Sequence, residues 1–267
     1  MLVQINWHML SYNMKITFLG TGGVHSLPQW GCDCKTCIST DPKNTRLRPV
    51  LLVEINNKSI AIDFGNDFAH QLKKFGVKKL DYIFLTHAHG DHFNGAEILS
   101  IVKNCTFATP VAVMRDLERR IDMEWVRARN PSLIIKEFES MTIECVVIET
   151  VQLEHKKDFP KNLTPCYGYI FRSKDFSFAY CTDYNKILEP EKLRDLDLLI
   201  SEASGWNDTG KGHVGVKEAI EVYKQLKPKK MLLMHINHNT EHNEVSEFVS
   251  QFGNIEVAFD GLVMSFK

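Results

Sequence analysis

The chain contains 267 residues, of which 44% are hydrophobic and 24% are charged, and its formal net charge is −1. At about 150 residues per domain, this length allows one or two domains. The hydrophobic fraction is ordinary for a globular protein and excludes disordered and fibrous classes. Lys and Arg (32) nearly balance Asp and Glu (33), so no overall charge attracts nucleic acid or an anionic membrane.

The chain carries no recognisable membrane or export signal. A membrane span needs about 18 apolar residues in a row, and no such run exists; Gln4, Asn6 and His8 interrupt the first apolar stretch. We therefore expect a cytoplasmic protein without a signal peptide. Residues 1–13 are interpreted as an N-terminal extension without an assigned function. Residues 14–267 are expected to form one domain, because no linker-like composition divides them.

Short β-rich segments alternate with helical patterns along the chain. In the first half, the pattern predicts strands over 15–19, 50–55, 59–62 and 82–85, and helices over 68–75, 91–102 and 114–127. In the second half, it predicts strands within 142–153, over 167–172, 177–182, 198–200 and 230–235, and within 257–266, and helices over 216–226 and 243–252. This alternation indicates an α/β fold in which sheets are flanked by helices.

A histidine-rich turn follows the strand predicted at 82–85. Four potential metal ligands, His87, His89, Asp91 and His92, lie within six residues of one another. The i, i+2 spacing lets the first two imidazoles point at one cation, whereas the last two residues follow where the chain enters a helix and can face a second cation. Imidazole and carboxylate bind divalent transition metals. The turn therefore predicts two adjacent metal sites.

The sequence His-Ala-His-Gly-Asp-His of this turn resembles the HxHxDH signature of the metallo-β-lactamase superfamily of binuclear metallohydrolases. Further polar residues follow in the order of that family: Asp63 ends an early strand, and His155, Asp183 and His235 lie later in the chain. The resemblance spans residues 15–266. It implies a metallo-β-lactamase αββα sandwich, in which two β-sheets are flanked by helices.

The same resemblance implies a division of the ligands between two metals. One metal would be bound by His87, His89 and His155, and the other by Asp91, His92 and His235. Asp183 would bridge the two ions, and Asp63 would orient one of the ligands without binding metal itself.

Three cysteines, Cys32, Cys34 and Cys37, lie within six residues. In a long cytosolic chain, such a cluster favours metal binding over disulfides. Tetrahedral zinc needs a fourth ligand, and His238, three residues after His235, is the candidate. The sequence thus predicts a structural zinc site in a loop around residues 31–37. The alternative is a group of three unrelated buried cysteines.

The two metal motifs together narrow the resemblance. The Gly-Thr-Gly-Gly turn at 20–23, the cysteine cluster, Arg46-x-Arg48-Pro49 and the late His-x2-His pair are similar to the PhnP-type phosphoribosyl 1,2-cyclic phosphate phosphodiesterases of the carbon-phosphorus lyase pathway. This similarity implies a di-metal centre associated with manganese, a structural zinc, and His213 as the substrate-facing histidine. The segment 156–162 is longer than expected for that family, so its contacts with the substrate are expected to differ from those of the family.

The lead-in at residues 27–30 is similar to another relative, PqqB of pyrroloquinoline quinone biosynthesis. PqqB proteins typically depart from the full hydrolase ligand set. This chain keeps that set, which favours hydrolysis over a PqqB-like role in cofactor biosynthesis.

The resemblance implies an enzyme that hydrolyses a small cyclic phosphodiester, with phosphoribosyl 1,2-cyclic phosphate as the expected substrate. Two active-site ions, Mn²⁺ or Zn²⁺, would share a hydroxide that attacks phosphorus. Asp91 and His213 are the predicted catalytic residues, His213 as a general acid or phosphate donor; a place beside a surface helix end is its alternative. Arg46 and Arg48 are either phosphate contacts or structural residues.

Other functions use the same ligands and stay open. A lactonase or thioesterase needs no additional motif. A nuclease that cleaves RNA phosphodiesters would need a gripping arm or a basic surface, which the sequence does not supply. A non-enzymatic zinc-bound interaction module conflicts with the intact set of seven ligands. The oligomeric state is also open, with a homodimer among the options.

Overall fold

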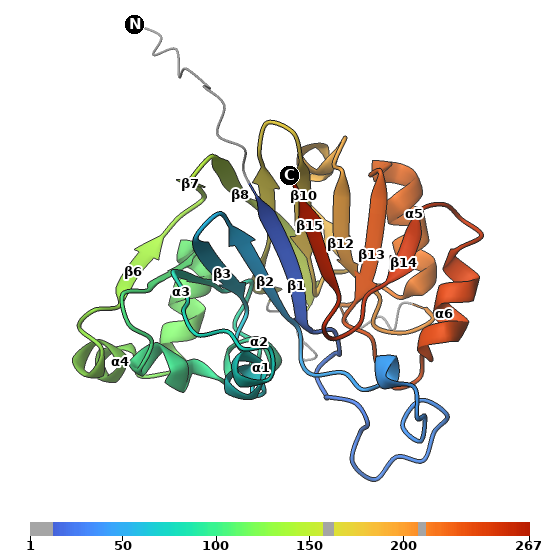
Figure 1. The fold of residues 1–267 in the computed structure, drawn as a ribbon, viewed down its shortest axis with the longest axis horizontal. Coiled ribbons are helices and arrows are strands. Elements are labelled where there is room, and N and C mark those ends of the chain that lie inside the picture. Colours follow the sequence, from blue (N-terminus) through green and yellow to red (C-terminus); the bar gives the residue numbers. More distant parts are fainter. Residues whose placement is uncertain (1–12, 157–162, 208–211) are drawn as a thin grey trace, which may run out of the picture.

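The computed structural model describes residues 13–156, 163–207 and 212–267. All but the last residue of the predicted N-terminal extension lies outside these ranges, and so does most of the segment 156–162. Within the described ranges, two β-sheets form the centre of the molecule and helices lie on their outer sides (Figure 1).

The first sheet has seven strands among the described residues. Their spatial order is β15 (Val263–Phe266), β1 (Met14–Gly20), β2 (Val50–Ile55), β3 (Lys58–Ile62), β4 (Tyr82–Phe84), β5 (Thr106–Thr109) and β6 (Ile134–Glu137). Strands β3 to β6 run parallel, whereas β1, β2 and β3 form an antiparallel meander. The hairpin predicted at 50–62 is therefore confirmed, but β5 and β6 were not expected from the sequence.

The second sheet has eight strands in the same described ranges. Their order is β11 (Lys186–Ile187), β8 (Val146–Lys156), β9 (Leu163–Arg172), β10 (Ser177–Cys181), β12 (Leu198–Glu202), β13 (Lys230–Met234) and β14 (Ile255–Val257), with β7 (Ser140–Ile143) paired to β8. Strands β10, β12, β13 and β14 run parallel. Their apolar runs, such as residues 198–200, are buried on both faces because core and helices cover them.

The helices form the two outer layers. They are α1 (Phe68–Lys74), α2 (Gly90–Phe93), α3 (Val111–Glu118), α4 (Met123–Arg129), α5 (Val216–Leu226) and α6 (His242–Val249), with short 3-10 turns η1 (Pro42–Asn44), η2 (Ala96–Ser100) and η3 (Pro190–Leu193). None of the helices in the described ranges has the length and hydrophobicity that crossing a bilayer requires.

Three apolar clusters hold these layers together. One lies between the sheets and includes Phe18 of β1 and Phe171 of β9. The second packs α5 and α6 onto the second sheet through Ile220 and Val245. The third packs α1, α3 and α4 onto the first sheet, with Phe68 among its members. The predicted αββα sandwich is therefore confirmed.

Two predicted helices are interrupted. The helix predicted over 91–102 is one turn of α-helix followed by η2, and the break falls at Gly95. A Cβ at Gly95 would lie 2.5 Å from the carbonyl oxygen of Gly65, so close packing sets the chain path there. The helix predicted over 114–127 is α3 and α4, because the side chain of Asp122 accepts a hydrogen bond from Trp125 N and starts a new helix.

Arg46 is completely buried and is a structural residue. Its Nη1 donates to Thr21 Oγ1 and to the carbonyl oxygen of Ala258, both at 2.7 Å, and its Nη2 donates to His242 Nδ1 at 3.0 Å. Arg46 thus joins the turn after β1 to the segment between β14 and β15 and to α6. Arg48 forms an ion pair with Asp67 at 3.1 Å. These contacts favour the structural interpretation of both arginines.

His242 makes stability dependent on pH. Burial, together with the positive charges of Arg46 and Lys43, lowers the pKa of His242 to about 4. The ordinary pKa of histidine is 6.5, so the unfolded chain takes up this proton first, and the stabilisation present above pH 6.5 is lost as pH falls toward 4. We expect this residue to reduce the free energy of unfolding by about 3 kcal/mol over that range.

Urea unfolding of the wild type and of His242→Gln at several pH values between 7 and 4 measures this effect. Gln can still accept the bond from Arg46 but does not titrate. The free energy of unfolding of His242→Gln should therefore fall less on acidification than that of the wild type. Parallel losses in the two proteins would contradict the prediction.

Candidate metal centre

Three of the predicted site residues lie directly beyond strand ends in left-handed backbone conformation. Asp63 follows β3, Asp183 follows β10 after one residue, and His235 follows β13, with φ values of 68°, 56° and 58°. Non-glycine residues rarely adopt this conformation, and each instance costs about 1–3 kcal/mol. The surrounding sheets hold Asp183 and His235 with their side chains 3.2 Å apart, and they hold Asp63 against His92. Such outliers cluster at functional sites.

The first cluster contains His87, His89, His155 and Asp183, whose potential ligand atoms all lie within 4.8 Å of one another. His89 Nδ1 and His155 Nε2 are 3.0 Å apart, and His87 Nε2 is 3.6 Å from Asp183 Oδ2. His155 Nδ1 donates to the carbonyl oxygen of Gly212, which leaves its Nε2 free to face the cluster. This is the group that the resemblance assigned to one metal, joined by the bridging carboxylate.

The second cluster contains Asp91, His92, Asp183 and His235, again within 4.8 Å. Asp183 Oδ1 lies 3.3 Å from His92 Nε2 and 3.2 Å from His235 Nε2, whereas its Oδ2 faces the first cluster. One carboxylate thus faces both groups of imidazoles with different oxygens. That arrangement is the one a bridging ligand requires.

Unpartnered nitrogens test whether these residues fit metal ions. His87 Nε2, His92 Nε2 and His235 Nε2 are buried and lack a hydrogen-bond partner among the described residues. Buried polar atoms normally have a hydrogen-bond partner or a bound ion. Three unpaired nitrogens that face two carboxylates therefore indicate that a cation or a hydrogen-bond donor binds among them. Imidazole and carboxylate together fit Zn²⁺ or Mn²⁺. The donor set therefore fits two divalent ions.

The charges within the site are mutually dependent. Burial opposes ionisation of Asp183, but the positive charges of His235 and His92 outweigh it and hold its pKa well below the usual range. For His92, burial is likewise outweighed, here by Asp183, Asp91 and Asp63, and the pKa is raised. Burial and the charge of His92 lower the pKa of His87. The buried carboxylates and imidazoles of the site thus determine one another's charge.

Asp63 contacts the site without facing either cluster. Its Oδ1 accepts bonds from Thr86 N (2.8 Å) and Thr86 Oγ1 (2.9 Å), and its Oδ2 accepts from His92 Nδ1 (2.8 Å). The bond to Nδ1 fixes the His92 tautomer, so that Nε2 points at the second cluster. A carboxylate bonded to the second nitrogen of a candidate metal-binding histidine is the kind of contact through which a residue can orient a ligand.

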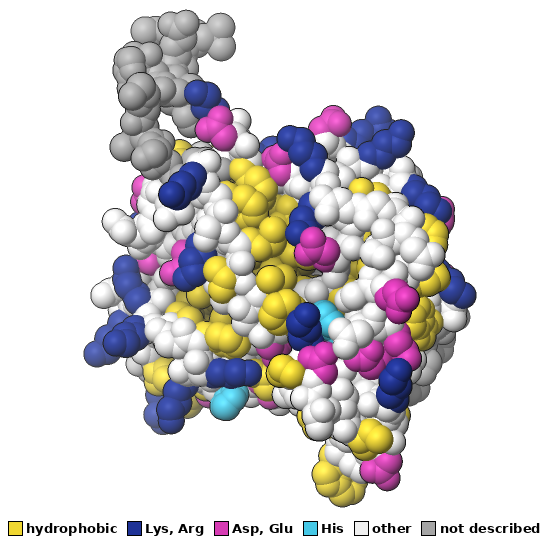
Figure 2. Space-filling view, turned by 45° about the vertical axis from the view of Figure 1, so that its right-hand side comes forward, with side chains coloured by type: hydrophobic (Ala, Val, Ile, Leu, Met, Phe, Trp, Pro, Cys, Tyr) yellow, Lys and Arg dark blue, Asp and Glu magenta, His cyan; other side chains and the backbone are white. Residues whose placement is uncertain are grey.

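The cysteine loop forms a separate cluster. Cys32, Cys34, Cys37 and His238 have ligand atoms within 4.8 Å, and His238 Nδ1 lies 3.2 Å from Cys32 Sγ and 3.7 Å from Cys34 Sγ. The pKa of the Cys34 thiol is lowered to about 6, because hydrogen bonds from Cys37 and Cys32 outweigh burial. The loop protrudes from the molecule (Figure 2), and Trp30 on it is 97% exposed.

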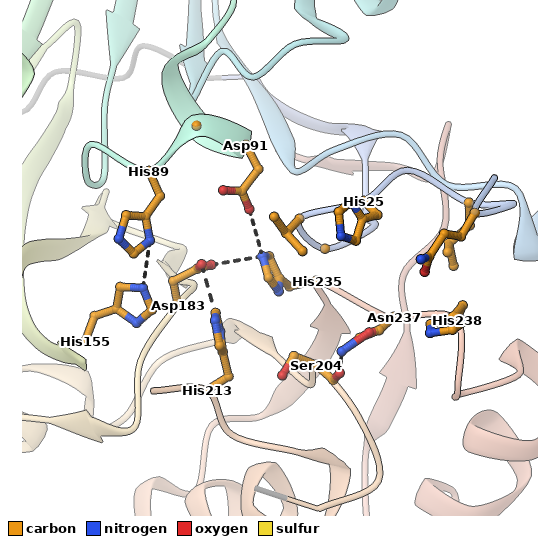
Figure 3. Close-up of a pocket in the computed structure, with 15 residues that line it drawn as sticks. His25, His89, Asp91, His155, Asp183, Ser204, His213, His235, Asn237 and His238 are labelled. Carbon is orange, nitrogen blue, oxygen red and sulfur yellow. Dashed lines mark hydrogen bonds and ion pairs between the residues drawn. The ribbon is translucent and has the colours of Figure 1, made fainter. Parts of the chain in front are cut away.

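His213 points into the same pocket as the two clusters (Figure 3). Its Nδ1 lies 2.9 Å from Glu202 Oε2 and 3.9 Å from Asp183 Oδ2. Burial lowers the pKa of His213, but the charge and hydrogen bond of Glu202 outweigh it and raise the pKa to about 10. Sequence reasoning missed Glu202, although a carboxylate at the end of an apolar strand was a signal that could have found it.

The pocket has a volume of about 610 Å³ and extends beyond the two clusters. His25, Gln29, Ser204 and Asn237 line it, and none of them was expected. His25 and Gln29 lie on the loop after β1, and the other two follow the ends of β12 and β13. Gln29 and Asn237 lie within the motifs at 27–30 and 235–238, but those motifs do not indicate that either side chain lines the pocket, so only the folded chain reveals these four residues.

Comparisons with known proteins identify the class of this fold and site. Residues 58–236 match the family model described as a beta-lactamase superfamily domain. The chain belongs to this superfamily of metallo-β-lactamase-fold hydrolases, as the HxHxDH motif predicted.

Particular relatives are similar over most of the chain. A diphosphatase of the PhnP family has a TM-score of 0.82 at 27% identity and covers 95% of this chain and 97% of its own. Zn²⁺-bound PqqB from Methylobacterium extorquens has a TM-score of 0.83 at 14% identity and covers 94% and 99%, which shows the shared fold alone.

Two curated relatives have different activities. The octanoyltransferase of Porphyromonas gingivalis is 26% identical over 264 residues, which cover 93% of this chain but 51% of that protein. The chain therefore spans about half the length of this relative. The ribonuclease Z of Clostridium beijerinckii is 24% identical over 219 residues and covers 73% of this chain and 68% of that protein.

Asp63→Asn tests the orienting contact. The substitution removes the carboxylate charge that favours a proton on His92 Nδ1. The amide NH2 of Asn can also donate to Nδ1, which would favour the wrong tautomer. We expect metal affinity to fall by about 10- to 100-fold, measured by competition with a chelating dye. Asp197→Asn, a substitution at a strand-linking carboxylate remote from the clusters, is the matched control. Equal affinity in Asp63→Asn and the control would refute the assignment.

Proposed function

We propose that this protein is a binuclear metal-dependent phosphodiesterase that hydrolyses a small cyclic phosphodiester, with phosphoribosyl 1,2-cyclic phosphate as the favoured substrate. The observation that carries this proposal is the convergence of both clusters on Asp183, beside a pocket that also contains His213. The similarity to a diphosphatase of the PhnP family supports a phosphoryl compound as the substrate class.

The ligand assignment follows the two clusters. His87, His89 and His155 would hold one ion, Asp91, His92 and His235 the other, and Asp183 both. Two such ions supply Lewis acidity at the phosphoryl oxygens and make water nucleophilic at neutral pH. Cys32, Cys34, Cys37 and His238 would hold a structural Zn²⁺. Because free thiolates persist in a reducing compartment, we also propose a cytoplasmic location.

His213 is placed to move a proton. A protonated ring that donates from Nδ1 to Glu202 also carries a proton on Nε2. In this orientation it can give a proton to the leaving alkoxide of the sugar. Glu202 is completely buried and acts as a positioning residue. Asp91 was predicted to be catalytic, and in this proposal it contributes as a ligand of the second metal ion.

A small substrate fits the chain better than RNA does. The net charge is −1, and RNA binding draws on a basic surface. We therefore infer that the ribonuclease Z relative shares the phosphodiester chemistry rather than the substrate. We also propose that residues 14–267 form one domain and that residues 1–13 are an N-terminal extension of it.

Turnover of phosphoribosyl 1,2-cyclic phosphate by manganese-loaded protein, followed by phosphorus NMR, tests this function. We expect conversion to ribose bisphosphate, and we expect His89→Ala to abolish it while most of the fold is kept. Bis(4-nitrophenyl) phosphate serves as the generic diester. Activity retained in His89→Ala would remove the catalytic assignment, and absence of turnover of both diesters would remove the proposed function.

The role of His213 predicts a dependence on the leaving group. A sugar alkoxide needs a proton, whereas 4-nitrophenolate does not. His213→Ala should lower kcat for the sugar diester by about 10²- to 10⁴-fold and change aryl diester turnover only slightly. Glu202→Gln should shift the sugar reaction in the same direction by a smaller factor. Equal losses on both substrates would contradict a proton-donor role.

A thioester is the second candidate substrate. The octanoyltransferase relative acts on an acyl group by its name, and its similarity covers 93% of this chain. The di-metal ligands would suit a thioester carbonyl as well as a phosphoryl group. Assay of an octanoyl thioester beside the two diesters decides between them: preferred turnover of the thioester would replace the phosphodiester assignment.

A further inference from the structure

The cysteine loop forms part of the catalytic pocket. Leu27 and Gln29, which precede Cys32, line the same cavity as His89 and His155, and so does the candidate zinc ligand His238. Figure 3 shows His25, Asn237 and His238 on the far side of His235 from His89 and His155. The pocket therefore has a metal-cluster side and a side built by the loop. We call the second side the recognition wall; it consists of His25, Gln29 and Asn237.

Contacts within the cysteine cluster tie the loop to the segment after β13. Cys34 Sγ lies 3.2 Å from the carbonyl oxygen of His238, and Cys32 Sγ lies 3.2 Å from His238 Nδ1. On the loop side, the backbone N–H of Gln29 donates to Cys37 Sγ at 3.3 Å. The sulfur of Cys37 thus fixes the backbone of a wall residue directly. An ion held by these four side chains would lock both segments together.

The segment from His235 to His238 is also held from the pocket side. Ile236 forms a parallel bridge with Gly22, and Asn237 Nδ2 donates to the carbonyl oxygen of Ser204. Gly23 lies against the ring of His235, where a Cβ would be 3.4 Å from Cε1. His235 of the second metal cluster, Asn237 of the wall and the candidate zinc ligand His238 therefore lie on one short, braced segment.

The wall has a definite chemistry. Its side chains are an exposed imidazole and two amides, and the carboxylates that line the cavity, Asp91 and Asp183, belong to the metal clusters. Asn237 Oδ1 is buried and has no hydrogen-bond partner among the described residues. Imidazole and amide groups bind hydroxyl or phosphate groups by hydrogen bonds. The wall thus suits a polar, hydroxylated or anionic part of a ligand.

We propose that the cysteine cluster positions the recognition wall, and that the wall binds the polar part of the substrate remote from the scissile phosphodiester. This inference rests on the proposed function. It assigns the cluster a part in substrate recognition in addition to stability. The cluster residues are positioning residues, whereas His25 and Gln29 touch the substrate.

Variants of the wall and of the cluster test this inference separately. His25→Ala and Gln29→Ala change side chains that are exposed or half-buried, so both should fold, and Cys32→Ser removes one candidate zinc ligand. Cys145→Ser, at a half-buried cysteine outside the cluster, is the matched control. Each protein is assayed for KM and kcat with phosphoribosyl 1,2-cyclic phosphate and with bis(4-nitrophenyl) phosphate. Zinc content, Tm and calorimetric affinity for ribose bisphosphate are measured in parallel.

We expect His25→Ala and Gln29→Ala to raise KM for the sugar diester and to weaken ribose bisphosphate binding by about tenfold, the effect of one lost hydrogen bond. Their kcat, zinc content and Tm should match those of the wild type, and aryl diester turnover should change little. Cys32→Ser should have a lower zinc content and a lower Tm, and its KM for the sugar diester should rise to the same extent. Cys145→Ser should behave like the wild type.

Two results would overturn the inference while leaving the proposed function intact. The first is turnover by the wild type with unchanged KM and product affinity in both wall variants. The second is a Cys32→Ser protein that folds, loses zinc and Tm, and keeps the wild-type KM, because the cluster would then contribute stability alone. Failure of the wild type on both diesters would instead remove the proposed function.

Discussion

The carboxylate of Asp183 lies between two groups of imidazoles, and the rest of the site depends on this shared charge. It is buried at a strained backbone position, and its two oxygens face different clusters. A buried carboxylate needs cationic compensation, which the proposed ions would supply. Displacement of Asp183 would leave both clusters incomplete at once.

This arrangement exists only where the two sheets meet. Asp63, His87 and His92 come from the edge of the first sheet and the turn that follows β4, whereas His155, Asp183 and His235 come from the second sheet. The apolar cluster between the sheets therefore determines the distances between ligands. Packing of the sandwich and assembly of the site are one event, in which burial of apolar side chains provides the free energy that holds strained, charged residues together.

The cysteine loop is proposed to position the residues that bind the substrate, as the sheets position the candidate metal ligands. It joins the pocket through residues on both sides of the cluster, so the geometry of the recognition wall follows from contacts to His238 and Gln29. In our proposal, catalysis and substrate recognition use opposite sides of the braced segment 235–238. His213 lines the pocket from the turn before α5, and the buried Glu202 at the end of β12 contacts it from behind.

Local features of this protein could be read from the sequence because they depend on short spacings. The six-residue histidine turn, the cysteine cluster and the hairpin at 50–62 are determined by neighbours along the chain, and the family signature added the order of His155, Asp183 and His235. The strands β5 and β6, the break at Gly95 and the burial of Arg46 could not be predicted, because they depend on contacts with distant segments. The same holds for Glu202, His25 and Asn237. The sequence by itself determined which ligands are available and the class of fold, whereas tertiary packing alone decided which nitrogens lose their partners and which loop forms the pocket wall, since burial and convergence arise only when both sheets are in contact.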